Sequence, residues 1–147
     1  MATQDIAFLS ATELGAAIKD KQVSPVEVVE AYLDRIERID PQVNSYITVM
    51  VEHARQEALE AEADIRRGDY KGPLHGVPIA IKDQIYTKGV LTTDASKIRS
   101  DFIPKFDATV VTNLKRAGAI LLGKLNMSEF AHGEPQSSAF GPARNPW

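Results

Sequence analysis

Residues 1–72 contain stretches in which apolar side chains recur at helical spacing. Ser10 and Glu13 form a capping box, in which each side chain can bond a free backbone N–H. A first helix is therefore predicted to begin there and to end near Lys21. The segment Ser24-Pro25-Val26-Glu27 repeats this pattern, with proline at the first helical position, where its missing N–H costs nothing. A second helix is predicted from here until Asp40-Pro41, because the residue before a proline disfavours helical backbone angles.

A third helix is predicted from about Val51 to Arg67, where the sequence is rich in alanine and glutamate. Between the second and third helices, residues 43–49 fit a short extended segment. The apolar stripe of the third helix is thin, so much of its surface should face water. This stripe consists of Ala54, Ala58, Ala61 and Ile65.

From residue 73 onward the pattern changes to short apolar runs separated by glycine and proline. Residues 77–82 are typical of a strand, and residues 119–122 of a second, buried strand. Between them, Asp107 is predicted to cap a helix that ends at Gly118. Strand, helix and strand in this order predict part of an α/β sheet. The helix side chains expected to face the core are Val110, Val111, Leu114 and Ala117.

Composition narrows the classes of function. A chain of 147 residues is long enough for one domain with its own core. Its net charge of −3 gives no basic surface for nucleic acid, so direct binding of RNA or DNA is not expected. There are no cysteines and the histidines lie far apart, so we expect no disulfide, metal or cofactor. Residues 1–5 lack the start of a signal peptide and no apolar run is long enough for a membrane span, so a cytoplasmic protein is expected.

The segment Pro73–Asp83 contains the strongest candidate for chemistry, because its apolar run ends on Lys82. A lysine at the end of a buried strand is costly unless it is paired, neutral or used. Two simpler explanations compete with catalysis: the side-chain stem packs while the amine reaches water, or Asp83 pairs with the amine. A catalytic base would require a desolvated amine whose pKa is low enough to accept a proton. The residues alone leave these alternatives open.

The segment Gly118–Lys124 matches most of a phosphate-binding loop, but we predict that it does not bind a nucleotide. Leu125 follows the lysine, where that motif needs a hydroxyl for magnesium. The residues between the glycines are apolar strand formers, whose N–H groups would be bonded within a sheet. Among the histidines, His53 is expected on a solvated helix surface and His75 in a loop hydrogen bond, while the role of His132 is left open.

Several segments resemble, in order, the motifs of the amidase signature family. No single segment is specific, but the ordered set covers residues 72–147 almost continuously, and the N-terminal helices fit as well. The segments are Gly72–Asp83, Thr92-Thr93, Asp107–Val111, Ala117–Ala119, Gly123-Lys124, Asn126-Met127, Glu129–Ala131 and Phe140–Trp147.

This resemblance implies an α/β fold, namely the α/β/α sandwich of the family with a mixed central sheet, incomplete in this chain. Residues 1–147 would be the N-terminal portion of a single amidase domain, mainly helical over residues 1–72 and strand-helix-strand over residues 73–147. The resemblance also implies a Ser–cis-Ser–Lys site in which Lys82 is the lysine, acting as base and later as acid through a bridging serine. The nucleophilic serine attacks an amide such as glutamine, releases ammonia and forms an acyl-enzyme. The family places both serines after the segment that matches Asn145–Trp147, so we expect a fragment that is inactive alone.

Matching the motifs in order places Ala131, His132 and Gly133 where relatives bind the acyl part of the substrate. His132 is unusual at its position, which indicates a substrate choice shifted away from glutamine. Asp94 and Leu125 also depart from the family pattern, and the loop after Gly133 is about one residue shorter than in relatives.

Within the family, residues 88–97 and 138–142 look most like the A subunits of glutamyl-tRNA amidotransferases. That branch implies two further partners, a B-type subunit that holds the charged tRNA and receives the ammonia, and a C-type subunit. Two alternatives stay open. One is a free amidase that releases ammonia from a small amide into water, and the other is a non-catalytic module that binds a partner through an unfinished sheet edge.

Overall fold

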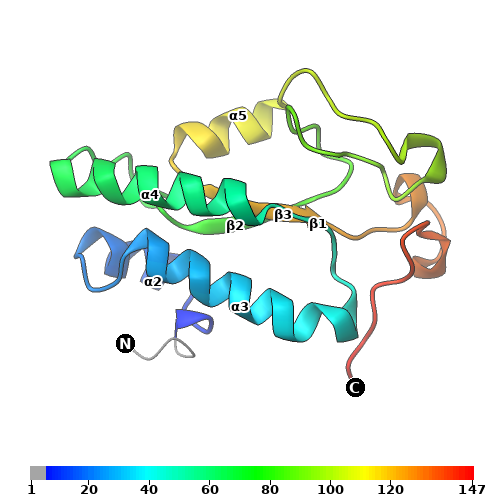
Figure 1. Cartoon of the computed structure of the whole chain (residues 1–147), viewed down its shortest axis with the longest axis horizontal. Helices are drawn as coiled ribbons and strands as arrows, with labels where there is room; N and C mark the ends of the chain where they lie inside the picture. Colours follow the sequence, from blue (N-terminus) through cyan, green and yellow to red (C-terminus); the bar gives the residue numbers. More distant parts are fainter. Residues whose placement is uncertain (1–5) are drawn as a thin grey trace. The chain divides into compact units, whose positions relative to one another are not determined.

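The computed structural model describes residues 6–147, which form helices and a small mixed sheet (Figure 1). Residues 1–5, on which part of the signal-peptide argument rests, lie outside the described residues. No helix in the described part of the chain is both long and apolar enough to cross a membrane. The elements are α2 (Ala11–Lys19), α3 (Pro25–Val43), β1 (Tyr46–Val49), α4 (Val51–Arg67), β2 (Pro78–Lys82), α5 (Thr109–Arg116) and β3 (Ile120–Leu125), with short 3-10 turns η1 (Lys97–Arg99), η2 (Glu129–Ala131) and η3 (Pro135–Ser137).

The three strands form one sheet in the order β1-β3-β2. Strand β1 pairs with β3 in the antiparallel direction. Strand β2 runs parallel to β3, because the Ile120 N–H donates to the Val77 carbonyl and the Asp83 N–H donates to the Leu125 carbonyl, both at 3.0 Å. The expected mixed sheet is therefore confirmed, and β3 extends three residues beyond the predicted end at residue 122.

The described chain divides into two compact groups of residues. The first runs to Ile36 and includes residues 50–79 and 113–122, while the second comprises residues 37–49, 80–112 and 123–147. In the first group, Figure 1 shows α2 and the start of α3 on one side of the first half of β3, and α4 on the other. The apolar cluster of this group consists of Ile6, Leu14, Ala17, Ile18, Val23, Val28, Ala31, Ile65 and Val77.

The predicted capping boxes of the first two helices, and the bounds and apolar stripe of the third, are confirmed. Both side chains of the capping box at Ser10 make their expected hydrogen bonds. In the second box, the Ser24 N–H donates to the Glu27 carboxylate at 2.8 Å and the Glu27 N–H donates to Ser24 Oγ at 3.1 Å. Helix α4 has the predicted bounds, and the four side chains of its thin apolar stripe are its buried residues.

The prediction that Asp40-Pro41 ends the second helix is wrong, because α3 continues to Val43. Pro41 lies in the last turn, so few helical hydrogen bonds depend on its missing N–H. The Asp40 carboxylate also accepts the N–H of Ser45 at 2.7 Å, which stabilises the chain just beyond the helix. The helix ends instead at Asn44, whose φ of 52° is left-handed.

Helix α5 differs from its prediction in two respects. It begins at Thr109, two residues after the predicted cap Asp107. The carboxylate of Asp107 accepts the N–H of Lys88, in the loop after β2, at 2.7 Å. Val110 is 48% exposed rather than facing the core, whereas Val111 is fully buried. Adjacent helical residues point about 100° apart, so Val110 can face solvent while Val111 faces the core.

Asn44 ties the end of α3 to a segment almost a hundred residues later in the chain. Its side-chain amide lies 3.1 Å from the carbonyl oxygens of Phe140 and Gly141 and 3.2 Å from that of Pro142. The amide of Asn126 donates to the carbonyl oxygens of Asn44 and Gly141, each at 2.9 Å. Two asparagines thus fix the backbone of residues 140–142.

His75 makes the predicted loop hydrogen bond, because its Nδ1 accepts the Lys71 N–H at 3.1 Å. The ring is fully buried, and the neutral form must carry its proton on Nε2, which has no hydrogen-bond partner within residues 6–147. Burial, with the charge of Lys71 acting in the same direction, lowers the pKa of His75 below its usual value. The folded chain therefore favours the neutral ring.

The stability of this chain is expected to fall as the pH drops below the ordinary histidine pKa of 6.5. The unfolded chain binds the His75 proton in that range before the folded chain does, so acid shifts the equilibrium toward unfolding. Urea unfolding at a series of pH values would measure this. His75→Asn keeps an acceptor for the Lys71 N–H and should weaken the acid dependence. His53→Gln, at the exposed histidine of α4, is the control, and equal acid dependence in all three proteins would contradict this prediction.

Candidate active site

Lys82 is the last residue of β2, and its side chain is exposed. Its amine has no hydrogen-bond or ion-pair partner within residues 6–147. The next residue, Asp83, continues the hydrogen-bonded pairing with β3. Because neighbouring residues of a strand point to opposite faces, Lys82 and Asp83 are directed to opposite sides of the sheet. This exposed amine fits a solvated lysine, and equally a base whose catalytic partners lie outside the described residues.

Asp83 does not pair with Lys82, so this alternative is wrong. Its carboxylate is fully buried and is bound by Thr93, whose N–H donates to Oδ2 at 2.8 Å and whose hydroxyl donates to the same oxygen at 2.6 Å. The other oxygen, Oδ1, has no hydrogen-bond partner among the described residues and lies 4.0 Å from the amine of Lys124. The aspartate beside Lys82 is therefore used to hold the loop that follows β2.

Lys124 is the buried lysine of this region. From β3 its amine donates to the Ile85 carbonyl at 2.8 Å and to the Thr92 hydroxyl at 2.7 Å. The side chain is fully buried, and burial lowers the pKa of Lys124 to about 8, against the opposing effect of the Asp83 charge. Two bonds hold the amine at two points of the loop after β2, and the nearby carboxylate balances its charge.

Lys124 belongs to one of the segments that resemble the family, Gly123-Lys124, but the sequence alone indicates no role for it. Lys124 lies between Gly123 and Leu125 at the end of an apolar run, as Lys82 ends the run in β2. The phosphate-binding motif would give Lys124 the role of a phosphate ligand. Because that motif is rejected, the sequence motifs leave the function of this lysine unassigned. A lysine inside an apolar strand pattern is compatible with a buried and paired amine, and of the two strands this holds only for Lys124.

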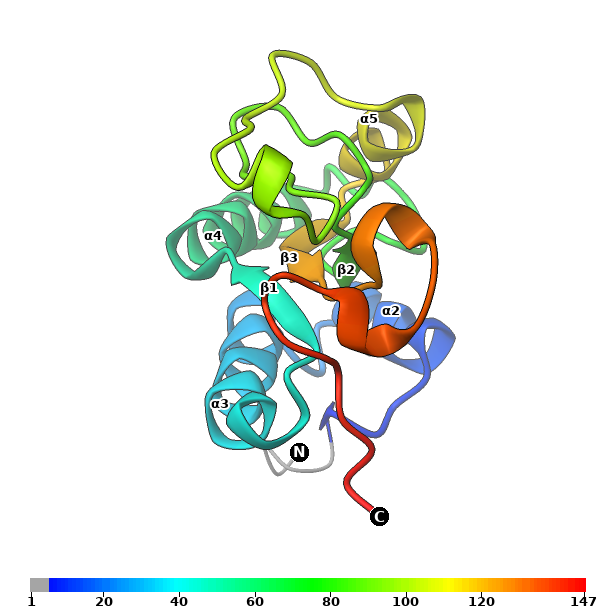
Figure 2. The ribbon, with the colours of Figure 1, turned by 90° about the vertical axis from the view of Figure 1, so that its right-hand side faces the viewer.

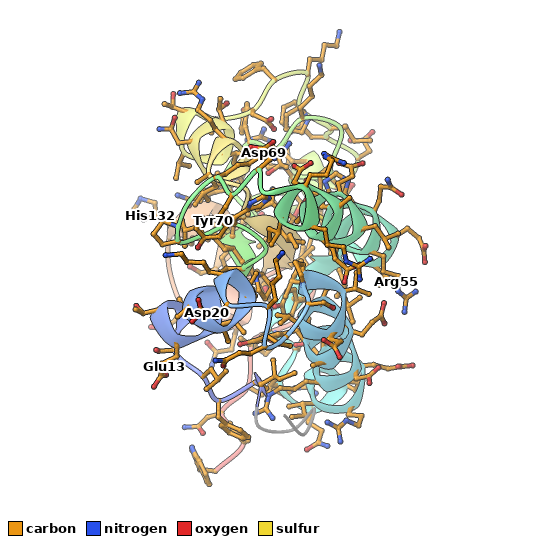
Figure 3. All side chains as sticks on the ribbon, turned by 90° about the vertical axis from the view of Figure 1, so that its left-hand side faces the viewer. Glu13, Asp20, Arg55, Asp69, Tyr70 and His132 are labelled. Atoms are coloured by element: carbon orange, nitrogen blue, oxygen red, sulfur yellow. The ribbon has the colours of Figure 1, made fainter. Side chains whose placement is uncertain are left out.

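The residues predicted to bind the acyl group follow β3. Ala131, His132 and Gly133 are all exposed, and Figure 3 shows the His132 side chain at the periphery, extending away from the ribbon. Among the described residues, no hydrogen bond or ion pair joins Lys82 to any of these three. Their role in binding substrate stays a prediction, as does the role of Lys82. No group of three or more His, Cys, Asp or Glu side chains in the described part of the chain could hold a metal ion.

Comparison with known families identifies the chain. The family model described as Amidase matches residues 27–147. The chain belongs to the amidase family. Lys82, Asp83, Lys124 and the segment 131–133 all lie within the matched region of this amidase chain.

The chain is similar to curated relatives that are each named as the A subunit of glutamyl-tRNA(Gln) amidotransferase. It is 48% identical to the protein from Carboxydothermus hydrogenoformans over 97% of this chain, and 51% identical to the protein from Geobacter metallireducens over 95% of it. It spans 30% and 29% of the length of these two relatives.

Solved amidase structures share the fold. A peptide amidase, PAM, in complex with the inhibitor chymostatin matches 97% of this chain with a TM-score of 0.89 and 33% identity. An amidase family protein from Bacillus anthracis matches 98% of this chain with a TM-score of 0.86 and 31% identity. The chain covers 31% and 30% of these two proteins, so it has the fold of part of an amidase domain.

Lys124→Met is expected to destabilise the chain by about 3 kcal/mol near neutral pH, because it leaves the Asp83 carboxylate without its counter-charge. The effect should also depend on pH. Between about 8 and the ordinary lysine pKa of 10.5, the unfolded chain keeps the Lys124 proton that the folded chain has lost. The unmodified chain therefore gains stability as the pH rises through this window, while methionine cannot titrate.

Denaturant unfolding from pH 7.5 to 10.5 would measure this as a widening difference between the two proteins. Lys105→Met removes an exposed lysine from the loop before α5 and serves as the control. A difference that stays constant across the window would contradict the assignment of Lys124 as the buried, titrating amine.

Proposed function

We propose that this chain is the N-terminal part of an amide-cleaving enzyme in which Lys82 is the general base. The observation that carries the proposal is the family match over residues 27–147, which includes Lys82. The position of Lys82 supports it, because the end of β2 holds the backbone in the sheet while the amine has no partner within residues 6–147. A base needs such an amine, available to a hydroxyl group that the rest of the domain would provide.

The chemistry of the proposed site follows the resemblance to Ser–cis-Ser–Lys amidases. The neutral Lys82 amine takes a proton from a bridging serine, which takes one from the nucleophilic serine as that serine attacks the amide carbon. The proton then returns through the bridge to the leaving nitrogen, so that ammonia departs and an acyl-enzyme remains. Attack by water, activated by the same relay, releases the acid and restores the serine. Closure of the site by the rest of the domain would supply the desolvation that Lys82 lacks in this chain.

We propose further that the acceptor of the ammonia is a charged tRNA. Support comes from the curated relatives, which are named as A subunits of glutamyl-tRNA(Gln) amidotransferase and are about half identical to this chain. In this proposal a small amide binds against Ala131, His132 and Gly133. Glutamine is the substrate of reference, and the unusual His132 is expected to shift the choice toward another small amide. B-type and C-type subunits would be the partners, and the tRNA would contact the B-type subunit rather than this part of the protein.

A test joins residues 1–147 to the remaining two thirds of the Carboxydothermus hydrogenoformans relative, in place of its matching segment. Lys82→Ala in this chimera should lower the rate of ammonia release from glutamine by about 100-fold or more, as expected for loss of a general base. Lys88→Ala, at an exposed lysine in the loop after β2, is the matched control and should keep most of the activity. A loss of less than about tenfold in Lys82→Ala would remove Lys82 from the proposed role.

The proposed full-length protein that contains residues 1–147 separates the two versions of the function, because most of the chimera comes from a relative named as an amidotransferase A subunit. Ammonia release that depends on a B-type subunit, and amidation of charged tRNA in its presence, would support the amidotransferase. Rapid release of ammonia without any partner would favour a free amidase. The 147-residue chain alone is expected to release none. Activity of this chain alone would contradict the proposed division of the site.

A further inference from the structure

Two pairs of consecutive residues in the second group have left-handed backbone angles without being glycine. Asp94 and Ala95 have φ values of 53° and 55°, and Phe130 and Ala131 have values of 48° and 59°. Residues with a Cβ adopt this region rarely, and usually singly. Such strain persists only where the surrounding structure enforces it, and it gathers at ligand and active sites.

The two strained pairs are bonded to each other. The Phe130 N–H donates to the Asp94 carbonyl at 2.9 Å, and the Ser96 hydroxyl donates to the Glu129 carboxylate at 2.6 Å. In Figure 2 the turn that contains η1 lies beside the orange segment that follows β3. We call this contact between residues 94–96 and residues 129–131 the clasp. It joins segments more than thirty residues apart along the chain.

The first half of the clasp is anchored to the residue next to Lys82. The Thr93 N–H and hydroxyl are both bonded to the Asp83 carboxylate, at 2.8 Å and 2.6 Å. On its other side, Arg99 forms an ion pair with Asp94 and stacks 4.0 Å above the ring of Phe102. The backbone of residues 93–95 is therefore fixed from both directions.

The second half of the clasp leads directly into the segment 131–133. Ala131 belongs to both, and the Ala131 N–H donates to the Ser128 carbonyl at 2.9 Å. The Ala139 N–H donates to the Ala95 carbonyl at 2.8 Å, so the segment returns to the first half of the clasp after Ser138. The loop between residues 131 and 138 is thus held at both ends, while residues 131–133 are exposed.

We propose that the clasp sets the substrate selectivity of the site, with Ser96 and Glu129 as positioning residues that fix residues 131–133 relative to Asp83 and Lys82. The inference rests on the proposed function, since it takes residues 131–133 as the acyl-binding segment. Three hydrogen bonds connect these residues. The Thr93 N–H donates to Asp83, the Ser96 N–H donates to the Thr93 carbonyl, and the Ser96 hydroxyl donates to Glu129. A fixed segment accepts a small linear acyl group such as that of glutamine, and it excludes a bulky one. Loosening the clasp widens the range of amides that fit.

The test uses the chimera of residues 1–147 with the remainder of the Carboxydothermus hydrogenoformans relative, in variants Ser96→Ala and Glu129→Ala. The readout is the ratio of kcat/KM for glutamine to kcat/KM for a bulkier primary amide, phenylalanine amide. Each variant should shift this ratio by about tenfold toward the bulkier amide, mainly through KM, since a pocket discriminates between acyl groups of different size by such factors. The double variant should show the same selectivity ratio as the single ones, because both remove the Ser96–Glu129 hydrogen bond. Ser96→Ala also removes the acceptor of the Ile98 N–H, which caps η1.

Two further variants separate positioning from plain stability. Glu129→Gln keeps an acceptor oxygen for the Ser96 hydroxyl and should restore most of the selectivity. Ser100→Ala, at an exposed serine just after η1, should leave the ratio unchanged even if it lowers the melting temperature. In the 147-residue chain itself, Ser96→Ala should speed hydrogen exchange of the Phe130 N–H, which reports the clasp without any catalysis.

The outcomes distinguish the two proposals. If the Lys82→Ala variant of the chimera keeps its activity, the proposed function is overturned. If Lys82→Ala is inactive, but Ser96→Ala and Glu129→Ala keep the selectivity of the parent, only the role of the clasp is overturned. Unchanged exchange of the Phe130 N–H in Ser96→Ala also overturns it, and this holds for variants too unstable to assay as enzymes.

Discussion

The burial of Lys124 is the constraint on which the candidate site depends. An amine inside a sheet must be given partners, since an uncompensated buried charge is costly. Lys124 obtains them from the Ile85 carbonyl, the Thr92 hydroxyl and the nearby Asp83 carboxylate. These three groups all lie in β2's extension and the loop after it, so the loop must fold back over the strand that carries the lysine. This one side chain therefore helps to set the position of the loop, together with the bonds from Thr93 to Asp83.

Two lysines on neighbouring strands illustrate how similar patterns lead to different environments. Lys82 and Lys124 each end an apolar run, yet within residues 6–147 one is exposed and the other fully buried. Burial and a lowered pKa are the usual marks of a functional lysine, and they fall on Lys124 rather than on the residue that the family motif selects. The buried amine already makes two hydrogen bonds within the fold and lies beside a carboxylate. The exposed amine of Lys82 has no partner within residues 6–147, so it is available to bind another group.

What could be predicted from the sequence was the part governed by local rules. The caps at Ser10 and Ser24 and the alanine stripe of α4 depend on residues within one or two turns of each other, so their patterns sufficed. The end of α3 was mistaken because the effect of Pro41 depended on the Asp40 carboxylate and the residues after it. The partners of Lys124 and the clasp were beyond such rules. They join segments about thirty to forty residues apart through backbone carbonyls and left-handed turns, which side-chain periodicity does not encode.

The asparagine that ends α3 makes the chain vulnerable to chemical ageing. The amide of Asn44 faces the carbonyl oxygens of residues 140–142, and all three contacts require it to donate. Deamidation would replace this donor by a carboxylate, which only accepts hydrogen bonds when it is ionised. The new charge would repel the same carbonyls. The link between this segment and α3 would then rest on the Asn126 amide and on the Arg144 N–H, which donates to the Val43 carbonyl at 2.7 Å. A one-atom change in a protein that is otherwise intact would thus remove the three contacts between Asn44 and residues 140–142 and leave this segment on fewer supports.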